Sequence, residues 1–243
     1  LGNPKILLLA FLGLDTEYYN GAWWFLTIYI LLVLLSSVLN RILLKYPNWL
    51  ALLFSLIIYV VAYLQRFKSI IVFDIEILDW IVHQLAYLGT SLFPFIVGAI
   101  FAKDKIYSKL VKITKNLKFK NVIGLALVVL MIIGHGIVQT LFVAPFIGIS
   151  FICIFNLLDR PSQLNQLLLF IGKHSTNLWL VHMFFYLVYF RKLVFLPKYP
   201  LFIYMWLVIL CLVTSFIINR IYMPLSQKLD TYLKSVLFEK GNK

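Results

Sequence analysis

The sequence has few charged residues, and acidic residues are the scarcest of them. Only 13% of its 243 residues are charged, with 9 Asp and Glu against 22 Lys and Arg, whereas soluble domains carry about 25% charge. Hydrophobic residues make up 63% of the chain, and the mean hydropathy is +0.95. A single soluble core cannot bury so much apolar surface, so we expect lipid to surround most of the chain.

Cysteines and the common catalytic motifs are scarce too. Cys153 and Cys211 lie in apolar runs, without a CxxC spacing or histidines at metal-ligand intervals, so we expect reduced thiols and no metal. The sequence has no phosphate-binding glycine loop, no His-Glu-x-x-His motif and no Gly-x-Ser-x-Gly motif. These absences argue against a soluble catalytic domain.

The net charge of +13 comes from basic residues in short segments between apolar runs. Residues 103–120 alone hold seven lysines and one acid, Asp104. Positive charge in short loops is typical of the cytoplasmic side of membrane proteins, so it indicates orientation rather than nucleic-acid binding. We therefore expect the carboxyl terminus in the cytoplasm. The acids expected on the opposite side are Asp15, Glu17, Asp74, Glu76 and Asp79.

Apolar runs of roughly 20 residues are long enough to span a bilayer. They predict an all-α fold, a polytopic transmembrane helix bundle of about seven spans over residues 1–224, followed by a cytoplasmic tail at 225–243. The chain begins Leu1-Gly-Asn-Pro without a signal-peptide pattern, which predicts an amino-terminal truncation. The expected spans are Gly21–Leu44, Asn48–Leu64, His83–Ala102, Asn121–Gln139, Thr140–Leu158, Leu167–Phe190 and Leu201–Pro224.

The sixth predicted span contains an unusually polar segment. It reads Ile171-Gly-Lys-His-Ser-Thr-Asn-Leu-Trp-Leu-Val-His182. Ionisable groups inside a membrane are costly and usually face a cavity, a partner or a substrate path. Ser175, Trp179 and His182 are spaced i, i+4, i+7, so they share one face of the helix.

These polar residues predict a cavity that opens outward. His182 lies about 22 Å from the cytoplasmic end of its span, and His135 lies near the outer end of the fourth span. We expect His182, His135 and Ser175 to act in catalysis, with a neutral histidine as general base toward a hydroxyl. The alternative is that they only tie helices together through hydrogen bonds. The residues expected to bind the substrate are Trp23, Trp24, Trp179 and Glu17.

Basic residues on the cytoplasmic side predict an anionic ligand. Lys103 and Lys105 begin the lysine-rich segment, and Lys173 extends the basic region into the sixth span. Together with Arg41, they are expected to bind a polyanionic cofactor. The alternatives are that these residues set the topology and contact anionic lipid head groups, and that Lys173 reaches the interface along its flexible stem.

Two segments resemble landmarks of the acyltransferase 3 family of integral-membrane O-acyltransferases. The first, Gly21-Ala-Trp-Trp-Phe-Leu-Thr-Ile-Tyr-Ile-Leu-Leu, resembles the family's Trp-Phe-Leu segment. The second, Leu169-Phe-Ile-Gly-Lys-His-Ser-Thr-Asn-Leu-Trp-Leu-Val-His182, resembles its late Gly-Lys-x-Ser-x-x-hydrophobic-aromatic-hydrophobic-x-His segment. The end of the third predicted span is also similar.

The resemblance implies a function. Members of the family move an acyl group, usually acetyl from cytoplasmic acetyl-CoA, onto a cell-surface carbohydrate. It therefore implies a multi-pass enzyme of the bacterial plasma membrane with acetyl-CoA as cofactor and an envelope glycan as acceptor. The family's main catalytic histidine belongs to an Arg/Lys-x10-His motif in a first helix, which has no counterpart here. A glutamate of O-antigen-modifying relatives is also absent from the first landmark, where Thr27 is nearby, so the acceptor class stays open.

Three other interpretations stay open on the sequence. A lipid-linked saccharide polymerase or flippase needs a large outer loop with arginines, but the longest outer loop expected here, Gln65–Val82, is acidic. A transporter shows paired, broken helices in two repeats, and Pro94 and Pro145 do not make such a pair. The third is an inactive remnant of an acyltransferase.

Overall fold

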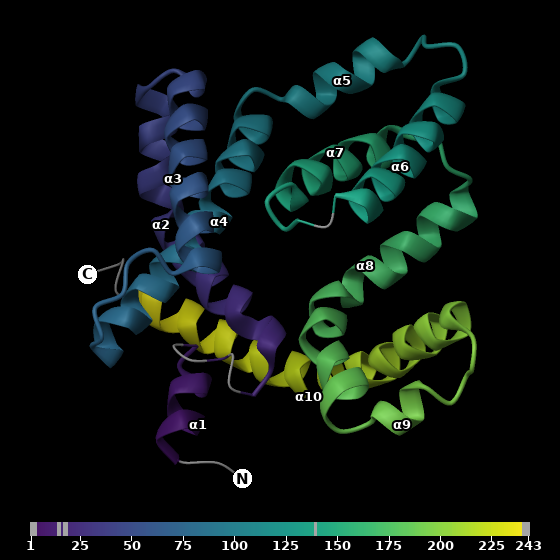
Figure 1. Cartoon of the computed structure of the whole chain (residues 1–243). Helices are drawn as coiled ribbons and strands as arrows, with labels where there is room; N and C mark the ends of the chain where they lie inside the picture. The colour runs from purple at the N-terminus through teal and green to yellow at the C-terminus, as the bar shows by residue number, and fades with distance from the viewer. Residues whose placement is uncertain (1–3, 14–15, 17–18, 139, 240–243) are drawn as a thin grey trace. The chain divides into compact units, whose positions relative to one another are not determined.

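The computed structural model of the protein describes residues 4–13, 16, 19–138 and 140–239. Within these residues the chain forms helices joined by short connections and has no strand (Figure 1). The predicted all-α fold class is therefore confirmed. The helices are α1 (Pro4–Phe11), η1 (Gly21–Trp23), α2 (Trp24–Lys45), α3 (Asn48–Lys68), α4 (Glu76–Lys103), α5 (Ile106–Thr114), α6 (Lys120–Ile137), α7 (Ala144–Leu157), α8 (Ser162–Met183), η2 (Phe184–Val188), α9 (Arg191–Val194) and α10 (Pro200–Glu239).

The chain divides into two compact units. The first consists of Leu1–Ala10, Thr16–Trp23 and Pro161–Lys243, and its main packing is that of α8 on α10. The second consists of Phe11–Asp15 and Trp24–Arg160, and it is built around α3 packed on α4.

Five of the described helical segments are long and apolar enough to cross a membrane. Their outer faces carry many exposed Leu, Ile, Val and Phe side chains, which require lipid rather than water as the surrounding solvent. The protein is therefore a multi-pass membrane protein. The five segments are Gly21–Lys45, Asn48–Lys68, Glu76–Lys103, Lys120–Ile137 and Pro200–Tyr232.

The predicted number of about seven spans is not confirmed. At the predicted fifth span the helix α7 has 14 residues, which gives about 21 Å of helix against a hydrocarbon core of about 30 Å. At the predicted sixth span, α8 begins at Ser162, directly after Pro161, and its regular α-helix ends at Met183. The helix α10 continues past Pro224 to Glu239, and the cytoplasmic tail at 225–243 stays a prediction.

Small residues bring α3 and α4 close together in the second unit. A Cβ placed on Gly89 would lie 2.5 Å from the Cβ of Ala62, so only a glycine allows this approach of the two helices. Two apolar clusters join α2 to α4. These clusters are centred on Ile28, Leu32 and Tyr87, and on Leu43, Ile96 and Ile100.

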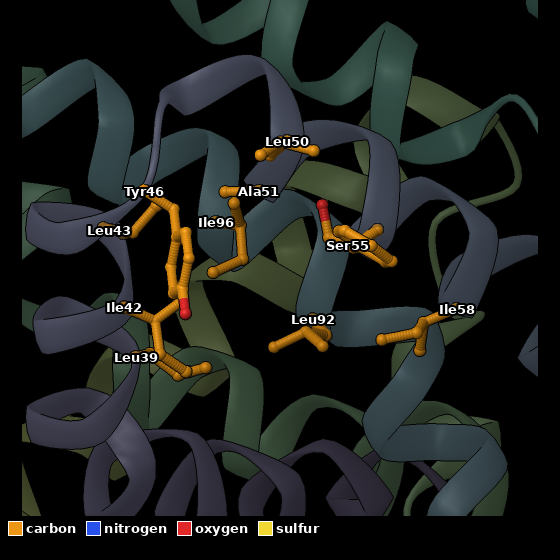
Figure 2. A pocket seen from close by; sticks show the side chains of 11 residues that line it. Leu39, Ile42, Leu43, Tyr46, Leu50, Ala51, Ser55, Ile58, Leu92 and Ile96 are labelled. Carbon is orange, nitrogen blue, oxygen red and sulfur yellow. The ribbon is translucent and has the colours of Figure 1, made fainter.

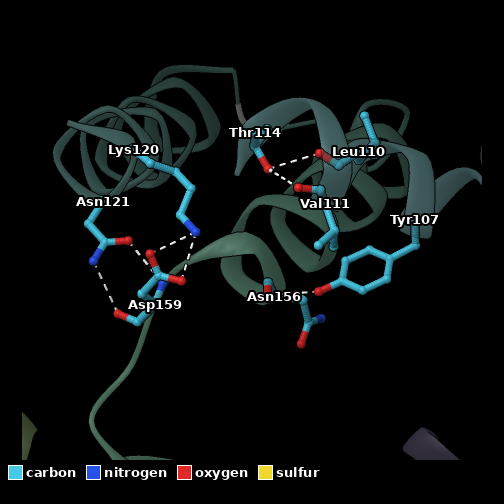
Figure 3. A network of polar contacts seen from close by, with 8 residues as sticks. All are labelled: Tyr107, Leu110, Val111, Thr114, Lys120, Asn121, Asn156 and Asp159. Carbon is cyan, nitrogen blue, oxygen red and sulfur yellow. Dashed lines mark hydrogen bonds and ion pairs between the residues drawn. The ribbon is translucent and has the colours of Figure 1, made fainter. Parts of the chain in front are cut away.

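Polar contacts join the start of α6 to the end of α7 (Figure 3). The Lys120 ammonium forms an ion pair with the Asp159 carboxylate at 2.7 Å. The Asn121 side chain accepts from the Asp159 backbone N–H at 2.9 Å and donates to its carbonyl at 3.2 Å. The Tyr107 hydroxyl donates to the Asn156 carbonyl at 2.8 Å, which holds α5 against α7.

Candidate functional site

The polar segment singled out in the sequence lies on α8, in the first unit. His182, in the last turn of α8, is half-buried, and its Nδ1 lies 2.5 Å from the carbonyl oxygen of Trp179. A carbonyl oxygen only accepts hydrogen bonds, so Nδ1 carries the proton and donates it. The other ring nitrogen, Nε2, then holds a lone pair. A neutral imidazole in this state can accept a proton from a hydroxyl group.

The helix changes its hydrogen bonding directly after His182. Residues Phe184–Val188 form a π-helical turn, and such turns are rare and frequently found at functional sites. The Phe184 N–H is directed to the carbonyls of Val181 and His182, whereas a regular α-helix would direct it to Leu180. The Leu180 carbonyl therefore does not have its regular helical donor.

Two side chains from the segment before α2 donate hydrogen bonds to the Leu180 carbonyl. Asn20 Nδ2 donates to the Leu180 carbonyl at 3.0 Å, and Trp23 Nε1 donates to the same oxygen at 2.9 Å. The Trp23 ring also meets the Phe184 ring edge to face, with centroids 5.4 Å apart. The structure thus brings Trp23, a predicted substrate-binding residue, to the end of α8 that carries His182.

The short segment before α2 is itself held by polar contacts. Asn20 is only 2% exposed, and its Oδ1 accepts from the Ala22 N–H at 3.0 Å. The Thr16 hydroxyl donates to the Trp23 carbonyl at 2.7 Å. These bonds fix the two donors that bind Leu180, so they also fix the geometry of the turn next to His182.

Ser175 and His182 do not form a direct pair. They are seven positions apart on α8, which corresponds to about 10 Å along the helix axis, well beyond a hydrogen bond. Ser175 is exposed. His182 is therefore too far from Ser175 along α8 to activate it as a nucleophile. A catalytic role of another kind for Ser175 stays a prediction.

A buried polar cluster lies between α8 and α10. Its α8 members, His174 and Asn177, belong to the polar segment noted in the sequence, whereas its α10 members, Ser215 and Asn219, were missed. His174 Nδ1 lies 2.8 Å from Ser215 Oγ. Asn177 Nδ2 donates to Ser215 Oγ at 2.9 Å and to Asn219 Oδ1 at 2.8 Å. His174 is 7% exposed and Ser215 is completely buried. Because a substrate cannot reach this pair, we interpret the cluster as a link between two helices.

In the second unit, Arg66 lies among aromatic rings at the end of α3. The centre of its guanidinium is 4.4 Å from the Trp24 ring centroid and 4.5 Å from the Tyr87 ring centroid. The Trp24 and Tyr87 rings are themselves stacked at 4.8 Å. Cation–π contacts of this kind contribute about 0.5–2 kcal/mol each, so the guanidinium is held in one position. Trp24 was predicted to bind substrate, whereas Arg66 was missed.

Arg66 and Trp24 line a cavity of about 270 Å³ within this unit. Its wall includes the segment before α7, which is fixed by a bond of 2.7 Å from the Tyr59 hydroxyl to the Phe142 carbonyl. The Tyr63 and Thr140 hydroxyls are 3.1 Å apart. The cavity combines aromatic ring faces with a fixed guanidinium and hydroxyl groups, a composition typical of small-molecule sites.

A comparison with known families agrees with the landmarks in the sequence. A sequence model of the acyltransferase 3 family, described as an acyltransferase domain, matches residues 2–220. The chain belongs to the acyltransferase 3 family. It is therefore a membrane acyltransferase. No curated protein and no solved structure matches the chain.

His135, the other histidine predicted to be catalytic, is exposed near the end of α6. His135 belongs to the second unit, whereas His182 belongs to the first. Each unit is compact by itself, and the cavity predicted to be shared by the two histidines stays a prediction. Glu17, a predicted substrate-binding residue, lies outside the described residues.

Lys103, a predicted cofactor-binding residue, has a role at the end of α2. Its ammonium donates to the Leu43 carbonyl at 2.6 Å and to Asn48 Oδ1 at 2.9 Å. The Leu43 carbonyl belongs to the last turn of α2, where carbonyls have no helical partner. A cation at this end of a helix also interacts favourably with the helix dipole. These contacts favour a capping role for Lys103.

The other residues predicted to bind the cofactor are exposed. Lys105 has a backbone φ of 52° just before α5, Arg41 lies on α2, and Lys173 lies on α8. Exposure leaves their side chains accessible to an anion, and binding of a cofactor by these residues stays a prediction.

Proposed function

We propose that this acyltransferase 3 protein moves an acetyl group from cytoplasmic acetyl-CoA to a hydroxyl of a cell-surface polysaccharide or another envelope glycan. The proposal rests on the family match over residues 2–220 and on the chemistry of the residues at the end of α8. Membership of an acyltransferase family favours this function over the polymerase, flippase and transporter alternatives.

The observation that carries the mechanism is the hydrogen bond between His182 Nδ1 and the Trp179 carbonyl. It leaves Nε2 as the proton acceptor. In the proposed step Nε2 takes the proton of a sugar hydroxyl while the hydroxyl oxygen attacks the thioester carbonyl carbon. The tetrahedral intermediate collapses with cleavage of the carbon–sulfur bond, and the proton passes to the departing CoA thiolate. The products are an O-acetyl ester and CoA.

The cavity beside Arg66 supports a carbohydrate acceptor. Its aromatic rings present apolar faces on which the C–H groups of a sugar ring can pack, and the guanidinium and hydroxyl groups can hydrogen-bond to sugar oxygens. We assign acceptor binding to Trp24 and Arg66, and donor binding to the exposed basic residues Lys105, Arg41 and Lys173.

The test is transfer of labelled acetyl from acetyl-CoA to the envelope glycan, measured in membranes that contain the protein. The expected product carries the label in an ester that mild base removes. In the variant His182→Asn, the amide nitrogen can still donate to the Trp179 carbonyl, but the base is lost. We expect the transfer rate to fall by about 10²–10⁴-fold with unchanged protein abundance.

The variant Gln166→Asn is the control, because Gln166 is an exposed residue of the same helix, α8, and it should keep the rate of the unmodified protein. If His182→Asn transfers acetyl at a near-normal rate, His182 is not the base and has only a structural role. Absence of any labelled glycan with the unmodified protein would overturn the proposed acceptor class.

A further inference from the structure

An apolar cavity lies next to the turn between α2 and α3, in the second unit (Figure 2). Its volume is about 440 Å³. One wall is the last two turns of α2, the opposite wall is the first turns of α3, and Leu92 and Ile96 of α4 close the back. The cavity exists because α3 packs extensively on α4 but makes few contacts with α2.

The walls of the cavity carry almost no polar groups. Ser55 lines it, but its hydroxyl already donates to the Leu52 carbonyl of the same helix at 3.0 Å. The Tyr46 hydroxyl is the other side-chain polar group of the lining (Figure 2). A buried water needs two to four polar partners, whereas apolar cavities stay dry or bind apolar ligands. The chemistry therefore fits a hydrocarbon.

The size and depth of the cavity fit one acyl chain. Its volume is about three times that of an apolar cavity of ~150 Å³ that holds one benzene. Along α3 the lining runs from Leu50 to Ile58, so the deepest residue lies about 15 Å from the turn at Pro47. The hydrocarbon core of a bilayer is ~30 Å thick. The depth of the cavity is about half of this value, and so it matches the hydrocarbon part of one leaflet.

Basic residues lie at the turn end of this cavity. The Lys45 ammonium lies 5.5 Å from the ring centroid of Tyr46, which itself lines the cavity. Arg41 lies one helical turn earlier on α2, and both basic residues are exposed. A cation at the mouth of a hydrocarbon-sized cavity complements a molecule with an anionic head and an apolar tail.

We propose that this cavity binds one acyl chain of an anionic phospholipid from the leaflet on the side of the α2–α3 turn, with Lys45 at the lipid head group. The chain enters between α2 and α3 and ends near Ile58. The lipid fills the gap that the sparse contact between the two helices leaves, and so it stabilises the position of α2 on α4.

Photolabelling of the purified protein in lipid nanodiscs tests the proposal. The probe is phosphatidylglycerol with a diazirine near the end of one acyl chain, and mass spectrometry locates the labelled peptides. We expect the label to concentrate on residues 39–58 and around Leu92. The variant Ile58→Trp fills the deep end of the cavity and should lower this labelling several-fold. Its matched control is Ile57→Trp, because Ile57 is exposed to a similar extent, 50% against 43% for Ile58, but does not line the cavity.

A second pair of variants tests the head group. In Lys45→Gln we expect the preference for phosphatidylglycerol over phosphatidylcholine to fall about fivefold, equivalent to ~1 kcal/mol per basic residue near a membrane surface. Lys68→Gln, at the far end of α3, should leave the preference unchanged. If Ile58→Trp alters the fold, Ile42→Trp fills the same cavity from α2.

Three results would overturn the proposal. The first is an even distribution of label over the exposed apolar faces of all helices, α6 included. The second is equal labelling of Ile58→Trp and Ile57→Trp. The third is efficient labelling of the cavity by a diazirine-bearing long-chain acyl-CoA but not by the phospholipid, which would make it a donor site. None of these measurements depends on acetyl transfer, so failure here leaves the proposed function intact.

Discussion

His174 Nδ1 and Ser215 Oγ lie 2.8 Å apart, although 41 positions separate the two residues in the sequence. Ser215 Oγ also accepts from Asn177, so one hydroxyl on α10 serves two side chains of α8. No water competes for buried groups of this kind inside a bilayer. The cluster therefore determines which faces of α8 and α10 meet, and with them the position of the helix that carries His182.

Replacing Ser215 with alanine should destabilise the first unit. The variant removes the partner of one Asn177 proton and leaves His174 Nδ1 with only the longer contact of 3.5 Å to Asn219 Nδ2, and a buried polar group left without its partner costs about 1–3 kcal/mol. Interhelical hydrogen bonds in bilayers contribute at most about 1.7 kcal/mol, so we expect a loss near 1–2 kcal/mol and a fall of several degrees in the unfolding temperature in detergent.

Thr214→Ala is the control for this prediction, because the Thr214 hydroxyl donates to the Leu210 carbonyl of its own helix, at 3.0 Å. Its unfolding temperature should stay close to that of the unmodified protein. Equal falls for the two variants would show that the His174–Ser215 contact has no special role.

The sequence predicts the helices of this fold better than their ends. Long uninterrupted apolar runs identify α2, α3, α6 and α10. In lipid the backbone N–H and C=O groups must bond to one another, and a helix satisfies all of them within one segment. The start of α8 at Ser162 was missed since its first turn is polar, and polar residues at the end of a span give no hydropathy signal. The length of α7 was overestimated because the apolar segment before it belongs to a turn.

The site could be predicted only in part. His182 and Trp23 could be identified because polar or amphipathic side chains in an apolar run are costly to place in lipid and therefore indicate a function. The bond from Trp23 to the Leu180 carbonyl lies beside a π-helical turn, and no residue pattern in Phe184–Val188 predicts such a turn. Arg66 was missed because an arginine near the end of a span is usually an interfacial anchor, and only the fold shows which rings surround it.

The two donors to the Leu180 carbonyl should compensate for one another. Asn20→Leu and Trp23→Phe each leave one side-chain hydrogen bond to this oxygen, and Asn20→Leu also removes the bond from the Ala22 N–H. We expect each variant alone to lower acetyl transfer by no more than a few-fold, with the larger loss in Asn20→Leu. The double variant leaves a carbonyl without a side-chain partner beside the π-helical turn, and we expect a loss greater than the product of the two single losses. Hydrogen exchange of the Val181–Val188 amides should rise only in the double variant. Purely multiplicative losses would contradict this arrangement.

Arg66 should affect the acceptor rather than the donor. Arg66→Lys keeps the positive charge but loses the planar group that lies against Trp24 and Tyr87, and lysine is not equivalent to arginine at a stacked site. We expect KM for the glycan to rise about tenfold, equivalent to ~1.4 kcal/mol, while KM for acetyl-CoA stays constant. A rise in KM for acetyl-CoA instead would assign this cavity to the donor.

The orientation of the protein can be tested at two exposed positions of the second unit. Lys112 lies in the lysine-rich segment on α5, and Glu76 begins α4 in an acidic stretch. Cys153→Ala and Cys211→Ala remove the native thiols, and Lys112→Cys or Glu76→Cys then supplies a single one. Because lysine-rich short loops stay in the cytoplasm, an impermeant maleimide should label position 76 in intact cells and position 112 only after permeabilisation. The opposite pattern would place the lysine-rich segment outside, and with it the basic residues assigned to acetyl-CoA, so that transfer from cytoplasm to cell surface would no longer fit this protein.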